Sequence, residues 1–136
     1  MMKDLKLVDQ DFTVREIQLA FVLARMRVID ESVPASKTKL ANLSQEDFYE
    51  ALVRVASMKT LPTPAEAKAA GCADGGELYL KLLENPKMLD EWLTSAREAA
   101  AQGERQPIHE ALDALVHLVI RTIESATAVR NAPGPR

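Results

Sequence analysis

Apolar side chains recur at spacings of three and four residues along almost the whole chain. In an α-helix this spacing gathers the apolar side chains on one face, whereas a strand requires alternation with period two. No segment alternates for long enough to predict a strand. Aromatic residues make up only 4%, so the core must be built from the aliphatic residues typical of helix packing. The sequence therefore predicts an all-α fold, a compact bundle of about five to six helices.

Capping and stop signals divide the chain into these helices. Thr13 with Glu16 forms a capping box that starts a helix running to about Asp30. Thr63 with Glu66 starts a short helix at Pro64, and glycines interrupt the chain soon after. The other expected helices span residues 45–59, 77–84, 87–101 and 107–129. In the last helix we expect an inward stripe made of Ile108, Leu112, Leu115, Val119, Ile123 and Ala126.

A chain of 136 residues supports one hydrophobic core, so we expect a single helical domain over residues 1–130. Residues 131–136, rich in Pro and Gly, read as a flexible tail. Inside the domain we expect three parts: a helix-loop-helix unit at 13–59, a short-helix insertion at 64–84 and a helical pair at 87–130.

Composition excludes several classes of partner. The net charge is −3 with the two signs interspersed, which argues against nucleic acid. No apolar run approaches the ~20 residues that span a bilayer, so we expect no membrane insertion. The single cysteine, Cys72, cannot form an intramolecular disulfide and favours a reducing, cytoplasmic location.

The first helix carries two apolar stripes. One comprises Val14, Ile17, Phe21, Ala24 and Val28, and the other comprises Leu19, Val22, Met26 and Ile29. A helix that is apolar around so much of its circumference either lies at the centre of the core or presents one face to another chain. Under the second interpretation, we expect the partner contacts to be Leu19, Val22 and Met26.

The segment from Asn42 to Phe48 has the order of residues with which an EF-hand loop enters its second helix: a hydroxyl, two polar residues, a carboxylate and then a Phe. Together with the apolar pattern of the first helix, the unit at 13–59 resembles an EF-hand. Counting back from Asp47 as loop position twelve, the ligand and glycine positions hold Ser36, Thr38, Leu40 and Ala41. The resemblance implies a degenerate EF-hand that does not bind calcium, because hard cations need several convergent oxygens.

The stretches Arg25 to Glu31 and Phe48 to Ala56 are also similar to calcium-independent helical modules of ciliary and flagellar proteins. This resemblance implies scaffolding or docking in an axonemal or intraflagellar assembly.

His109, Asp113 and His117 stand four residues apart, so a helix stacks them along one face that could hold zinc or poise a general base. The same face continues through Arg121 and Glu124, as a solvated face does. Zinc binding or metal-assisted hydrolysis is therefore the alternative function.

Two further residues invite a functional reading. Cys72, in a glycine-rich stretch, could be an exposed reactive thiol, but no histidine is close enough in sequence to activate it, so we favour an incidental cysteine. Trp92 could anchor an interface or fill the core. We expect no catalytic residue, metal or cofactor, and predict a non-enzymatic module that binds another protein.

Overall fold

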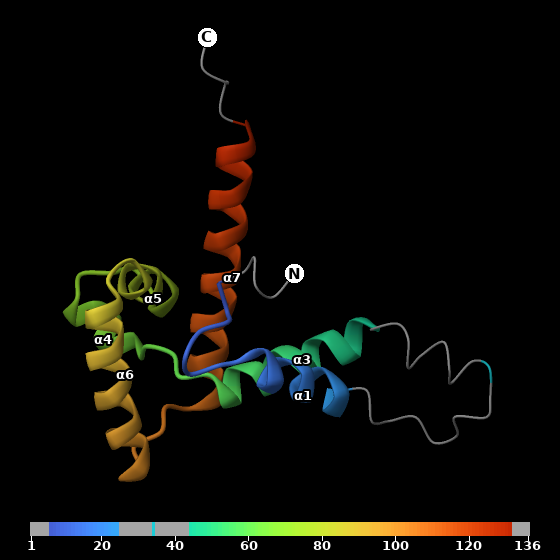
Figure 1. The fold of residues 1–136 in the computed structure, drawn as a ribbon, viewed down its shortest axis with the longest axis horizontal. Coiled ribbons are helices and arrows are strands. Elements are labelled where there is room, and N and C mark those ends of the chain that lie inside the picture. The colour runs from blue at the N-terminus through green and yellow to red at the C-terminus, as the bar shows by residue number, and fades with distance from the viewer. Residues whose placement is uncertain (1–5, 25–33, 35–43, 132–136) are drawn as a thin grey trace.

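The computed structural model describes residues 6–24, 34 and 44–131. Over these residues it holds six helices and no strand, which confirms the all-α prediction. The helices are α1 (Val14–Ala24), α3 (Gln45–Met58), α4 (Pro64–Ala69), α5 (Gly75–Glu84), α6 (Pro86–Ala101) and α7 (Ile108–Asn131). In Figure 1, α1 and α3 lie side by side on one side of α7, and α4, α5 and α6 lie on the other.

The helix starts follow the predicted capping chemistry. The Ser44 hydroxyl accepts a hydrogen bond from the backbone N–H of Asp47, and the Asp47 carboxylate accepts one from the N–H of Ser44. Thr63 and Glu66 form the same reciprocal pair at α4. Each box satisfies N–H groups that the first helical turn leaves without partners, which fixes where the helix begins.

The start of α5 differs from the sequence prediction. We expected Gly75 and Gly76 to interrupt the chain ahead of a helix at Glu77, but both glycines lie in the first turn of α5. The reason is Asp74, whose carboxylate accepts the Glu77 N–H at 2.9 Å and caps the helix two residues earlier.

Gly76 brings α5 against α7. A Cβ atom at this position would lie 2.4 Å from the backbone nitrogen of Leu118, and one at Gly75 would lie 2.7 Å from the carbonyl oxygen of Pro62. Only the absence of side chains lets the two backbones approach this closely. The crossing of α5 and α7 is the most extensive contact between helices.

This crossing decides which face of α7 is buried. The buried residues are Ala111, Ala114, Leu115, Leu118 and Thr122. The predicted inward stripe is right at Leu115 and partly right at Leu112 and Val119, which are half-buried and pack against the core. It is wrong at Ile108, Ile123 and Ala126, which are exposed. The side of α7 that carries Leu118 packs against α5, because the glycines of α5 leave room for the α7 backbone at this point.

Candidate functional site

The outward face of α1 is the first candidate site. Ile17, Ala20 and Ala24 are buried against the core, whereas Leu19 is 48% and Val22 is 52% exposed. These two side chains lie three residues apart, on the side of the helix opposite the buried stripe. Met26, the third predicted contact, lies outside the described residues. We call Leu19 and Val22 the outer face of α1.

A groove between α6 and α7 is the second candidate site. It has a volume of about 720 Å³ and is walled by the end of α3, the segment that leads into α4, the second half of α6 and the first turn of α7. Its apolar lining consists of Ala56, Met58, Leu61, Ala65, Ala96, Ala99, Ala100, Ile108 and Ala111. Ile108 at its edge is 46% exposed, so part of the apolar lining faces solvent.

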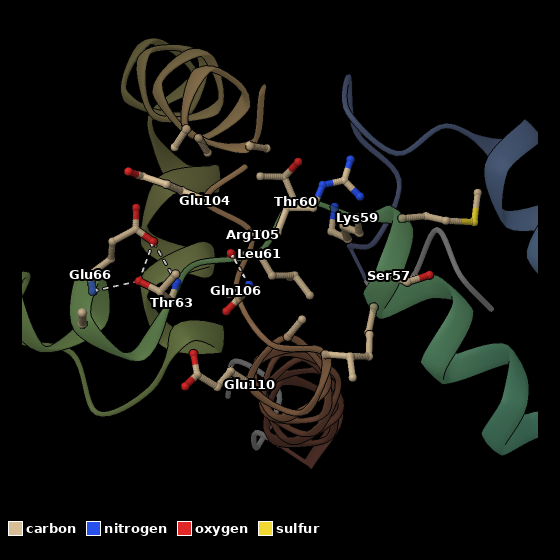
Figure 2. Close-up of a pocket in the computed structure, with 18 residues that line it drawn as sticks. Ser57, Lys59, Thr60, Leu61, Thr63, Glu66, Glu104, Arg105, Gln106 and Glu110 are labelled. Carbon is tan, nitrogen blue, oxygen red and sulfur yellow. Dashed lines mark hydrogen bonds between the residues drawn. The ribbon is translucent and has the colours of Figure 1, made fainter. Parts of the chain in front are cut away.

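Carboxylates dominate the charged lining of this groove. Glu66, Glu104 and Glu110 lie on the same side of the close-up in Figure 2, opposite Lys59. The position of Glu66 is fixed, because its oxygens accept from the Thr63 hydroxyl at 2.9 Å and from Trp92 Nε1 at 3.0 Å. Among the described residues, Glu104 and Glu110 make no ion pair.

Lys59 also lines the groove, but its ammonium points away from it and is buried in a polar cluster with Asp9 and Tyr79. Lys59 Nζ lies 2.5 Å from Asp9 Oδ2, and it donates to the Tyr79 hydroxyl at 2.9 Å and to the Leu7 carbonyl at 3.2 Å. The Tyr79 hydroxyl donates to the same Asp9 oxygen. Phe12 and Tyr79 present their rings to the ammonium as cation–π partners.

Burial and charge shift the pKa values of this cluster. Burial by itself would raise the pKa of Asp9, but the hydrogen bonds from Lys59 and Tyr79, together with the lysine charge, hold it below its ordinary value. Burial lowers the pKa of Lys59, and the contacts with Asp9 offset only part of that effect. The pKa of Tyr79 is raised by burial and then by the Asp9 carboxylate.

The cluster holds the N-terminal segment on the helices. The Lys59 side chain is completely buried, so solvent and substrates do not reach its amine. Leu7 and Phe12 are fully buried on either side of Asp9. Sequence analysis missed this anchor because residues 6–12 have no helical period. The one available signal was Lys59 itself, which directly follows α3 and stands four residues after the buried Val55.

The structure does not gather the histidine face into a metal site. His117 Nδ1 lies 2.9 Å from the Asp113 carbonyl oxygen and 3.4 Å from its carboxylate, and His109 is exposed. The described residues hold no group of three His, Cys, Asp or Glu side chains that could bind a metal ion. The three residues lie along one helix face as expected, but none of the residues that the structure describes joins them as a further ligand.

Cys72 is buried, and Trp92 is half-buried against the core. Cys72 is only 8% exposed, and Lys81 Nζ lies 3.3 Å from its sulfur, so the alternative of an exposed thiol is wrong. The backbone N–H of Cys72 donates to the Ala67 carbonyl at 2.8 Å, which folds the turn after α4 inward. Trp92 packs against the core and against Tyr79 edge-on, which confirms its core interpretation.

No protein-family model, curated protein or solved structure matches the chain. None of the described helices is long and apolar enough to cross a membrane. The proposed loop positions Ser36, Thr38, Leu40 and Ala41 lie outside the described residues, so the resemblance to a degenerate EF-hand stays a prediction.

Proposed function

We propose that this chain is a non-enzymatic interaction module that binds an amphipathic helix of another protein through the outer face of α1. The observation that carries the proposal is the half-exposure of Leu19 and Val22 on a helix whose opposite side already packs on the core. α1 thus supplies one apolar stripe to the fold and leaves a second one to solvent.

The spacing of the outer face suits helix-in-groove recognition, in which apolar anchors repeat every three or four residues. Fully burying a Leu or Val side chain contributes about 1.5–3 kcal/mol, so covering two half-exposed ones contributes roughly half of that for each. These contacts are sufficient for a modest hot spot at the centre of a larger interface.

Two observations favour interaction over catalysis. The lysine with the lowered pKa, Lys59, is sealed from solvent by Asp9 and Tyr79. His109, Asp113 and His117 lie along one side of α7, and no other described residue joins them in a group that could hold a metal ion. The resemblance to ciliary and flagellar modules would make the partner a component of such an assembly, bound without calcium, and that assignment is part of the proposal.

The direct test is affinity capture from a cell extract with the tagged chain and its Leu19→Asp and Val22→Asp variants. Ile120→Asp is the matched control, because Ile120 on α7 is 46% exposed and receives the same new charge. We expect the α1 variants to lose a partner that the wild-type chain and Ile120→Asp retain. Circular dichroism should show unchanged helicity, since exposed substitutions usually change stability by about 0.5 kcal/mol.

Loss of helicity in Leu19→Asp or Val22→Asp would show that the outer face belongs to the core. Equal capture by all variants would show that the outer face is not the binding surface.

A further inference from the structure

We infer that the groove between α6 and α7 receives a basic segment of a protein partner, with a lysine or arginine side chain lying on its alanine floor and the charge meeting Glu104 and Glu110. The inference rests on the proposed function for the kind of partner, a protein. It assigns a second surface, separate from the outer face of α1, and the chemistry that this surface recognises.

The floor of the groove is apolar and is made of small side chains. Ala96, Ala99 and Ala100 are half-buried on the side of α6 that faces the groove, and Ala111 of α7 is buried opposite them. Methyl side chains let a bound chain come close to the helix backbones. The alkyl stem of a lysine or arginine is an appropriate occupant, because it covers apolar surface while its charged end stays at the rim.

The rim is acidic. Glu104 and Glu110 make no ion pair among the described residues, and Glu66 is held in place beside them by Thr63 and Trp92. Arg105 is the one described groove cation with an available charge, because the Lys59 ammonium is neutralised by Asp9 behind the groove wall. The available charge of the groove is therefore mostly negative, so the groove attracts a cation and repels an anion.

The openness of the groove favours a polypeptide segment over a free small molecule. Sites for small ligands are usually concave enough to bury most of the ligand surface. Here Glu104, Arg105 and Ile108 are exposed along the edge, so an occupant would be covered on one side only. A segment anchored by other contacts of its own protein does not need full enclosure.

The test uses the 136-residue chain, labelled with ¹⁵N, and two synthetic helical peptides of leucine and alanine. The peptides carry either lysine or glutamate at the same positions. We expect the lysine peptide to give saturable shifts at the amides of Ala96, Ala99, Ala100 and Gln106, and the glutamate peptide to give none there. The double variant Glu104→Gln/Glu110→Gln should weaken the lysine peptide by about fivefold to tenfold, as the loss of two exposed ion pairs does.

The matched control is Glu84→Gln/Glu124→Gln, which removes the same charge from exposed positions outside the groove. Equal weakening in this control would overturn the inference, because the peptide would then respond only to net charge. Shifts confined to surfaces other than the groove, or equal shifts of the groove amides with both peptides, would also overturn it. Saturation of the same amides by butylammonium alone, as tightly as by the peptide, would assign the groove to a small cation instead.

The outcome is separable from that of the proposed function. Val22→Asp should bind the lysine peptide as the wild-type chain does, because the outer face of α1 does not line the groove. Failure of the groove test therefore leaves the α1 experiment standing.

Discussion

At the scale of single residues, the molecule depends on a buried charge pair that local sequence patterns do not reveal. Asp9 lies in a segment whose apolar residues have no helical spacing, and its partner Lys59 is fifty positions away in sequence. Its carboxylate also accepts the backbone N–H groups of Asp11 and Phe12 at 2.9 Å, which shapes the turn that buries Phe12. One carboxylate thus organises the N-terminal segment and neutralises Lys59, the only fully buried lysine among the described residues.

Replacing Asp9 with Asn should destabilise the protein by about 3 kcal/mol, because removing one partner leaves the other charge buried without compensation. The double variant Asp9→Asn/Lys59→Met should be more stable than the single variant, since no buried charge then remains. Urea denaturation of the three proteins measures this difference. A single variant as stable as the wild-type chain would show that the pair is not buried as described.

The same pair predicts acid sensitivity. The folded pKa of Asp9 is held below its ordinary value, so its contribution to stability is complete above the unfolded-state pKa of about 3.9 and is lost as the pH falls through the lower folded value. The free energy of unfolding should therefore fall more steeply below pH 4 in the wild-type chain than in Asp9→Asn. Unfolding curves collected from pH 6 to pH 2 check this, and parallel curves would contradict it.

At the scale of elements, the two glycines of α5 set the position of α7. In an exposed helix, replacing Gly with Ala would stabilise by up to about 1 kcal/mol. Gly76→Ala should instead destabilise by about 2–3 kcal/mol, because its Cβ would lie 2.4 Å from the Leu118 nitrogen and would force the helices apart.

Gly103→Ala is the control for this substitution. Gly103 has φ of +88° and nothing within 4 Å, so alanine there meets only backbone strain, costing about 1 kcal/mol. Thermal unfolding should therefore rank Gly76→Ala well below Gly103→Ala. The reverse order would show that α5 and α7 do not cross at Gly76.

The elements also show what local patterns can predict. Helix starts at Ser44 and Thr63 were predictable, because a capping box lies within four residues of chain. The capping role of Asp74 was missed, because two glycines after it read as an interruption. The inward face of α7 was only partly predicted for a different reason: several of its faces carry apolar residues, and the packing of α5 at Gly76 and of α3 selects among them.

At the scale of the whole molecule, α7 is the common support for both halves of the fold (Figure 1). It packs against α5 on one side and α3 on the other, and Arg121 adds an ion pair with the Asp74 cap of α5. The exposure of Leu19 and Val22 on α1 could be predicted as one of two alternatives, because a helix with two apolar stripes is either surrounded by the core or leaves one stripe to solvent. The groove was not predictable, because residues far apart in sequence line it.

The central claim is that the outer face of α1 contacts another protein. The most direct measurement is photo-crosslinking in a cell extract, with a benzophenone probe attached at residue 22 through Val22→Cys and, in a separate protein, at residue 120 through Ile120→Cys. The buried Cys72 should stay largely unlabelled in both. We predict one discrete heavier adduct from residue 22 and none from residue 120. No adduct at residue 22 above the level seen at residue 120 would contradict the claim.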